Sequence, residues 1–303
     1  MSSAVHSKMR SLLTVALLAY ISAAAAFRHT GAHRHNLQDA SHTELPSVAI
    51  CVLHKDQNED VEEWLDYHLG LGVSKVFFMD NNSTVPIREA LSKYESVVHY
   101  EDVFNADAAP LNQQMYAYKK CLEHKDEVAW MAFIDVDEFI VLKTKEHWSL
   151  PQLLMEYKDE GALAMNWVMF GSNSHVRRPE QHTLHAYTRC IQPHPTRTEH
   201  IKTIVNTAHV ADISGDPHHF HYVEGKTAVN ENHVPVVNTP FTEGASVSKI
   251  ACHHYVLKSL EDFSHKIKRG SGDGGNTSKN LDWFIAIDSM ATAYCTPGSK
   301  FNI

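Results

Sequence analysis

Short apolar runs alternate with segments of helical periodicity along residues 47–170, and this alternation constrains the fold more than any other feature. The apolar runs are rich in Val, Ile and Phe with little polar alternation, as in strands buried on both faces of a parallel sheet. The helical segments between them would cover the two faces. The sequence therefore predicts an α/β fold with a mostly parallel sheet flanked by helices, followed by a less regular C-terminal part.

The expected elements can be placed along the chain by their periodicity and by their capping residues. The pattern predicts strands at 47–53, 75–79, 96–100, 128–134 and 162–170. It predicts helices at 59–70, 86–94, 111–123 and 149–158, and a last helix that begins at Ser259. Residues 47–290 contain no internal repeat and no linker, so we expect one domain there.

Two acidic residues directly follow the fourth predicted strand. Asp135 and Asp137 are one residue apart, so an extended backbone would point both carboxylates to the same side. Two such carboxylates at the carboxyl end of a strand repel each other unless a cation lies between them. Hard oxygen ligands suit Mn²⁺ or Mg²⁺, which keep water and substrate oxygens in their coordination shell. The segment predicts a divalent-metal site, with a solvated turn as the alternative.

Several segments, taken in order, resemble glycosyltransferase family 92 and the related family-2-like enzymes that carry a DxDEF motif. They are 58–73 (NE…EWLDYH…LGV), 80–83 (DNNS), 135–139 (DVDEF), 167–172 (WVMFGS) and 254–270 (HYVLKS…RG). The resemblance spans about residues 47–290. It implies a GT-A fold, which is Rossmann-like. It also implies transfer of a hexose, with galactose as one candidate, from a nucleotide diphosphate sugar, with UDP-sugar expected, to a glycan hydroxyl with inversion.

The resemblance implies that Asp135, Asp137 and His254 hold the Mn²⁺ or Mg²⁺. The ion would act as a Lewis acid and neutralise charge that develops on the leaving nucleotide diphosphate. It would also explain how a chain with a net charge of −9 binds an anionic donor. The adjacent His253 is the alternative to His254.

The same resemblance implies a set of residues that bind the donor and the acceptor. These are Asn58, Glu59, Asp80 and Asn81 for the base and ribose, Trp167 and His175 for the sugar or acceptor, and Lys258, Lys266 and Arg269 for the diphosphate. Residues 270–275 would form a loop that orders over the donor. Helix capping by Asn58 and Glu59, a turn at Asp80, and a surface ion pair between Asp262 and Lys266 are the alternatives.

An inverting transfer needs a base that takes the proton of the acceptor hydroxyl. Glu261, Asp262 and Asp282 are the carboxylate candidates, although each also fits an exposed helix surface. Glu138, which follows the acidic pair, is a candidate for orienting a metal-bound water or the sugar.

The N-terminus predicts entry into the secretory pathway. Lys8 and Arg10 precede an apolar run of 16 residues at 12–27, slightly short of the ~18–20 that span a bilayer. A signal-anchor helix and a cleaved signal peptide remain alternatives. We therefore expect a Golgi lumenal protein with single-pass type II topology, or a cleaved secretory form. The expected organisation is 1–27 leader, 28–46 polar stem, 47–290 glycosyltransferase domain and 291–303 tail.

The chain contains 5 cysteines, which fits an oxidising compartment. Cys51 and Cys121 lie in apolar patterns, so we expect them to be buried thiols. Cys190, Cys252 and Cys295 leave room for one disulfide, and an odd total leaves at least one thiol unpaired.

Composition excludes some classes of protein and leaves two alternatives. With 43% hydrophobic and 21% charged residues the chain is not globally disordered, and its acidic balance excludes a general nucleic-acid binder. One alternative is a secreted, His-rich metal- or carbohydrate-binding protein, because the chain has 23 histidines. The other is a haloacid-dehalogenase-type phosphatase, although Glu138 and Phe139 are atypical after its DxD.

Overall fold

A computed structural model describes residues 44–104, 112–144, 146–194, 198–270 and 279–296. The chain divides into two units, Met1–Glu44 and Leu45–Ile303, and nearly all described residues belong to the second. The predicted leader, most of the predicted stem, residues 271–275 of the predicted loop and residues 297–303 of the predicted tail lie outside the described residues.

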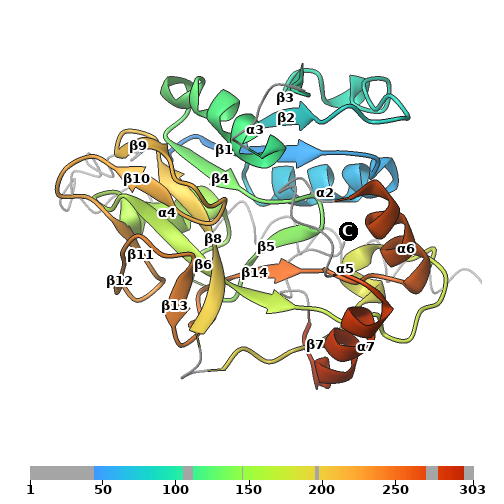
Figure 1. Ribbon diagram of the computed structural model, residues 1–303. Helices are drawn as coiled ribbons and strands as arrows, with labels where there is room; N and C mark the ends of the chain where they lie inside the picture. The colour runs from blue at the N-terminus through green and yellow to red at the C-terminus, as the bar shows by residue number, and fades with distance from the viewer. Residues whose placement is uncertain (1–43, 105–111, 145, 195–197, 271–278, 297–303) are drawn as a thin grey trace, which may run out of the picture. The chain divides into compact units, whose positions relative to one another are not determined.

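Parallel strands form the N-terminal part of the sheet in the order β4-β1-β2-β3 (Figure 1). Their bounds are β1 Val48–His54, β2 Lys75–Asp80, β3 Val98–Asp102 and β4 Trp130–Phe133. Along β1, Val48, Ile50 and Val52 face one hydrophobic core, whereas Ala49 and Cys51 face the other. Burial on both faces explains why this run is apolar without alternation.

The sheet continues beyond β4 with strands of mixed direction. These strands are β5 Glu138–Leu142, β6 Ala162–Met169, β8 Thr198–Asn206, β11 Ala228–Val229, β12 Pro235–Val236, β13 Phe241–Glu243 and β14 Ile250–His254. Strand β8 is antiparallel to β4 and β6, while β14 pairs with β5 antiparallel and with β6 parallel. The predicted α/β class is confirmed, and its parallel section continues into an antiparallel one.

Helices cover both faces of the parallel section. These helices are α2 Asn58–Gly70, α3 Gln113–Leu122 and α4 Leu150–Leu154. A hairpin of β9 Val210–Ile213 and β10 Phe220–Tyr222 also covers the sheet. Helices α2 and α4 share one core, and α3 shares the other with the β9–β10 hairpin. Trp64 Nε1 and the Tyr67 hydroxyl of α2 donate hydrogen bonds to the carbonyl oxygens of Glu138 (2.8 Å) and Ile140 (2.9 Å). These bonds fix the start of β5 against α2.

The remaining elements are α5 Thr183–Ala186, β7 Arg189–Cys190, α6 Leu260–Arg269, α7 Leu281–Met290 and β15 Ala293–Tyr294. Helix α6 begins where the sequence predicts: the Ser259 side chain accepts from the Asp262 amide, and the Asp262 carboxylate accepts from the Ser259 amide. In Figure 1, α6 lies beyond the arrowheads of β1 and β2. It therefore stands at the carboxyl edge of the parallel strands.

Some expected elements differ from the structure. The predicted helix 86–94 is wrong: turns and a 3₁₀ segment at Ser92–Tyr94 occupy it. The predicted helix 149–158 has the expected Ser149 cap but continues after α4 as a 3₁₀ segment, Met155–Tyr157. Strand β5 was not predicted, because its run follows the acidic pair without an intervening loop. Helix α7 was not predicted either. A further 3₁₀ segment spans Lys125–Glu127.

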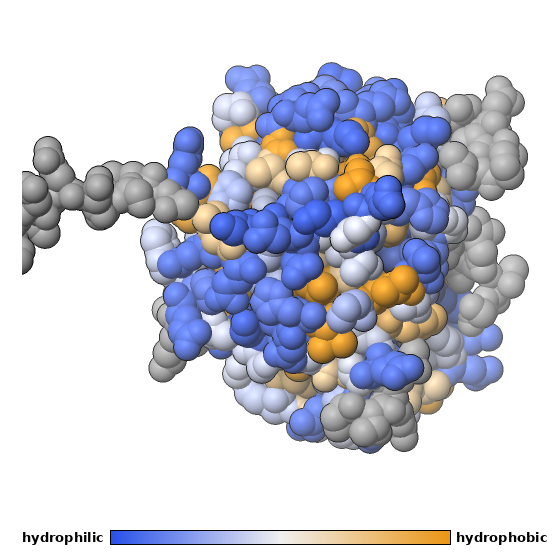
Figure 2. Space-filling view, turned by 90° about the vertical axis from the view of Figure 1, so that its left-hand side faces the viewer, coloured by the Kyte–Doolittle hydropathy of each residue, from blue (hydrophilic) through white to orange (hydrophobic). Residues whose placement is uncertain are grey.

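The described part of the chain has no helix that is long and apolar enough to cross a bilayer. The face in Figure 2 is mostly hydrophilic, and its hydrophobic residues occur in small groups. Scattered apolar residues of this kind are normal on protein surfaces.

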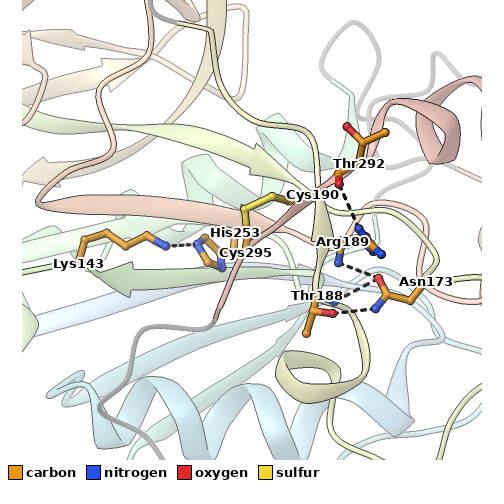
Figure 3. The surroundings of a disulfide bond; sticks show 8 residues. All are labelled: Lys143, Asn173, Thr188, Arg189, Cys190, His253, Thr292 and Cys295. Atoms are coloured by element: carbon orange, nitrogen blue, oxygen red, sulfur yellow. Dashed lines mark hydrogen bonds between the residues drawn. A yellow bond between two sulfur atoms is a disulfide. The ribbon is translucent and has the colours of Figure 1, made fainter.

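Two disulfides cross-link the domain. The expectation that Cys51 and Cys121 are buried thiols is wrong, because β1 and α3 bring them together on one face of the sheet and they form a disulfide. A second disulfide joins Cys190 of β7 to Cys295 (Figure 3). The sequence left room for one bond among Cys190, Cys252 and Cys295, and Cys252 remains a buried thiol.

Candidate active site

A cavity of about 220 Å³ opens at the carboxyl edge of the parallel strands. Its polar lining includes two aspartates, two histidines besides His54, and several cations. The lining includes Asn81, Gln114, Asp135, Asp137, Trp167, Lys202, His218, His254, Lys266 and Arg269. Ligands of open α/β sheets bind outside this edge of the strands, so the cavity lies where a substrate is expected.

Asp135 and Asp137 both line the cavity, but a turn brings them there instead of an extended strand. The Glu138 amide donates to the Asp135 carbonyl oxygen (3.0 Å), which closes the turn between β4 and β5. The Asp135 amide in turn donates to Glu138 Oε2 (3.0 Å). The two carboxylates line the same cavity, as predicted. The predicted reason is wrong, because a turn and not an extended backbone places them there.

Asp135 accepts hydrogen bonds from Gln114 Nε2 (2.8 Å) and Lys202 Nζ (2.9 Å). Lys202 is buried on β8 and also lies 3.3 Å from Glu138 Oε2. Burial raises the pKa of the Glu138 carboxyl, and the Lys202 charge opposes that shift. A buried lysine between two carboxylates thus supports the base of the cavity.

Asp137 is paired with Lys266, whose Nζ lies 2.6 Å from Asp137 Oδ2. Burial alone would raise the pKa of Asp137, but the Lys266 ammonium outweighs it and holds that pKa well below its usual range. The surface ion pair between Lys266 and Asp262 is therefore absent: Asp262 pairs with Arg178 instead (2.6 Å). Lys266 faces the cavity, as the resemblance implies.

His254 fits a metal-ligand role. Its Nε2 lies 3.8 Å from Asp137 Oδ1, and its buried Nδ1 has no hydrogen-bond partner and lies 3.7 Å from Glu138 Oε1, which also has none. Burial lowers the pKa of His254 to about 3, so the imidazole is neutral and can donate a lone pair. His253 points away from this cavity to Lys143 Nζ (2.7 Å; Figure 3). Two carboxylates and one neutral imidazole that line the same cavity therefore suit a divalent cation.

Three further predicted residues line the cavity: Asn81, Trp167 and Arg269. The Asn81 Oδ1 and Trp167 Nε1 atoms are buried without a hydrogen-bond partner. Arg269 is the last residue of α6, and burial lowers the pKa of its guanidinium while nearby aspartates oppose the shift. Unsatisfied buried polar atoms of this kind need a partner, and a polar ligand would supply one.

Other predicted binding residues lie next to the cavity. Asn58 and Glu59 line an adjoining cavity of about 430 Å³. Asp80 lies behind the site, where His54 Nδ1 (3.1 Å) and the Ser83 hydroxyl bond its carboxylate. Lys258 Nζ lies 2.6 Å from Asp60 Oδ1.

The remaining predictions lie outside the main cavity. The His175 ring bonds the Ala186 carbonyl oxygen (3.3 Å). Among the base candidates, Glu261 accepts from the Arg178 amide (2.9 Å), Asp262 caps α6, and Asp282 lies exposed in the first turn of α7. None of the three lines the main cavity.

Sequence reasoning missed several residues in or behind the cavity, among them Gln114, Lys202, His218 and Asp216. His218 lines the cavity, and its Nδ1 lies 2.9 Å from Asp216 Oδ1. The sequence signal for Lys202 was one lysine inside the apolar strand run of β8. A signal for His218 was the Asp-Pro-His-His segment, which is indistinct in a chain with 23 histidines.

The sequence profile of glycosyltransferase family 92 matches residues 47–257. The chain belongs to glycosyltransferase family 92. Family 92 proteins of Oryza sativa subsp. japonica and Arabidopsis thaliana are 28% and 26% identical to it, over 61% and 75% of this chain and 31% and 40% of their own length. This chain thus spans less than half the length of these relatives. Membership in this family disfavours the phosphatase alternative.

Solved structures resemble the chain weakly. TarS 1-349 of S. aureus covers 80% of this chain and 70% of its own at 16% identity, with a TM-score of 0.39. The mannosyltransferase PcManGT of Pyrobaculum calidifontis, in complex with GDP-Man and Mn²⁺, covers 41% of this chain and 36% of its own at 16% identity, with a TM-score of 0.32.

Proposed function

We propose that this family 92 chain transfers a hexose, with galactose as the first candidate, from a UDP-sugar to a glycan hydroxyl with inversion. The observation that carries the proposal is the cavity at the carboxyl edge, where Asp135, Asp137 and His254 meet Lys266 and Arg269. The paired carboxylates suit a divalent metal ion. The positively charged side chains of Lys266 and Arg269 suit a diphosphate. This mixture of charges is what a metal-bound nucleotide sugar requires.

In this proposal Asp135, Asp137 and His254 hold Mn²⁺ or Mg²⁺. The ion would supply a Lewis acid for the leaving diphosphate. Lys266 and Arg269 add positive charge from α6 and bind the phosphate oxygens. Trp167, whose ring centroid lies 5.2 Å from that of His218, offers an aromatic face for a sugar.

We assign the acceptor proton to His218, which lines the cavity. Asp216 holds its Nδ1, and the Thr203 hydroxyl donates to its carbonyl oxygen (2.5 Å), so ring and backbone are both fixed. The acceptor O–H proton passes to Nε2, and the acceptor oxygen bonds to the anomeric carbon. The bond from that carbon to UDP breaks, and its electron pair leaves with UDP.

We also propose that the chain works in the lumen of the secretory pathway, with the Golgi as the expected compartment. The two disulfides support this location, because such bonds persist in oxidising compartments.

The function is tested by incubating the chain with Mn²⁺, a panel of UDP-sugars and glycan acceptors, and measuring UDP release and glycan product. Asp137→Asn should lower the rate at least about 100-fold, since charge stabilisation by a metal contributes several kcal/mol. Asp126→Asn, an exposed aspartate outside the cavity, is the matched control and should retain the native rate. A native chain that acts on no UDP-sugar would contradict the proposal.

The base is tested separately with His218→Gln and with His221→Gln, a control at an exposed histidine nearby. His218→Gln should lower kcat about 10²–10⁴-fold with little change in donor KM, and added imidazole should restore part of the activity. If the two variants are equally active, the base lies elsewhere, and Glu261, Asp262 and Asp282 become the next residues to substitute.

A further inference from the structure

A second group of metal-ligating side chains lies on the edge strand of the sheet. His99 and Glu101 belong to β3, and His124 follows α3; one ligand atom from each lies within 4.8 Å of the others. Within the part of the chain that the structure describes, this is the group of three metal-ligating side chains whose ligand atoms lie close enough together to share one ion. None of the three lines the cavity described above.

Strand geometry and an aromatic contact hold the two imidazoles in place. His99 and Glu101 are two residues apart on β3, so they point to the same side. Phe77, paired with His99 across the strands, stacks on His124 with ring centroids 4.8 Å apart and meets His99 edge-on at 5.8 Å. The two histidine rings are 4.7 Å apart. Packing therefore brings two nitrogen ligands to one point.

A carboxylate behind His124 orients its ring. His124 Nδ1 lies 2.6 Å from Glu127 Oε1, which leaves Nε2 for another partner. Carboxylate-to-histidine contacts of this kind fix the tautomer and orientation of metal-ligating imidazoles. The His124 amide donates to the Cys121 carbonyl oxygen (3.0 Å), and Cys121 is bonded to Cys51 of β1. The segment is thus tied to the sheet beneath it.

The charges around the group leave it open to a cation. Lys120 Nζ lies 3.7 Å from Glu101 Oε1 but 2.7 Å from Glu123 Oε2, so its closer partner is Glu123. Lys75 pairs with Glu127.

We propose that His99, Glu101 and His124 bind a divalent transition metal, for which Zn²⁺ is the probe. Imidazole ligands suit Zn²⁺, whereas Mg²⁺ and Mn²⁺ suit carboxylates and water. Three protein ligands leave one position of a tetrahedral shell to water. The ion would link the edge strand β3 to the end of α3. Its role is separate from the proposed glycosyl transfer.

The site is tested on the full chain after metal is removed with a chelator. Zn²⁺ binding is measured by equilibrium dialysis for the native chain, for His99→Gln with His124→Gln, and for His182→Gln with His185→Gln, a control at two exposed histidines. The native chain and the control should bind one more Zn²⁺ than the first variant. Excess Mn²⁺ should not displace that ion. An equal number of bound ions in all three would overturn the proposal.

A second variant guards against a general effect of the double substitution. Glu101→Gln keeps both imidazoles and removes one oxygen ligand, so Zn²⁺ affinity at this site should fall at least about 10-fold. Co²⁺ bound in place of Zn²⁺ should give visible absorption bands in the native chain that weaken in Glu101→Gln. Unchanged affinity and unchanged bands would exclude Glu101 as a ligand and contradict the proposed site.

Discussion

The cavity at the carboxyl edge of the parallel strands and the group of His99, Glu101 and His124 at the edge of the sheet both combine carboxylates with imidazoles, but they differ in how those side chains are paired. In the cavity, Asp135 and Asp137 each pair with a lysine that is largely buried. At the edge, His99, Glu101 and His124 already lie together, and the ion pairs around them are exposed. In the cavity, lysines therefore neutralise the carboxylates when no ligand is bound. At the edge, the three side chains already lie close enough together to bind one ion.

Buried and exposed ion pairs should differ most in how much they contribute to the free energy of unfolding. Lys202→Met should lower the free energy of unfolding by about 3–5 kcal/mol, because it leaves Asp135 and the buried Glu138 without a counter-charge. Lys75→Met removes the exposed partner of Glu127 and should cost less than about 1 kcal/mol. Urea denaturation measures both free energies, and equal losses at the two positions would show that burial does not distinguish these ion pairs.

The Cys51–Cys121 bond should stabilise both the fold and the proposed metal site on β3. Cys51→Ser with Cys121→Ser should lower the free energy of unfolding by about 2–4 kcal/mol and weaken Zn²⁺ binding, because the bond ties the end of α3 to β1. Cys252→Ala, at the unpaired buried thiol, should cost about 1 kcal/mol and leave Zn²⁺ binding unchanged. Undiminished Zn²⁺ affinity without the disulfide would show that it does not position His124.

A smaller effect is expected at the mouth of the cavity. Arg269→Ala should raise the KM for the UDP-sugar about tenfold, which corresponds to about 1.4 kcal/mol of lost phosphate binding. Arg177→Ala removes an exposed arginine that lines no described cavity and should leave KM unchanged. Steady-state kinetics with varied donor distinguishes the two, and a native KM in Arg269→Ala would remove that residue from the donor site.

The parallel half of the fold could be predicted because burial on two faces marks its strands directly. The runs at β1, β2 and β4 are apolar on both faces, and the Ser259 cap marks α6. The segment 86–94 has a proline and apolar residues like a short helix, yet it folds mostly as turns. Because the segment is short, its local preference for a helix is weak, and tertiary packing decides its conformation.

The site was predictable where motifs lie next to strand ends and unpredictable where it depends on long-range pairing. Asp135, Asp137 and His254 meet in one cavity as expected. Lys202 reaches Asp135 because β8 inserts antiparallel beside β4, and no local pattern encodes that pairing. The same is true of the His99–His124 contact, which depends on how α3 ends against β3.

In the proposed function, Asp135, Asp137 and His254 hold the catalytic ion. This assignment can be tested by titration of Mn²⁺ into the chain in the presence of UDP, followed by electron paramagnetic resonance. The native chain should take up one Mn²⁺ that depends on UDP, and both His254→Ala and Asp137→Asn should lose it while His253→Ala keeps it. Native Mn²⁺ uptake in Asp137→Asn and His254→Ala would contradict the account.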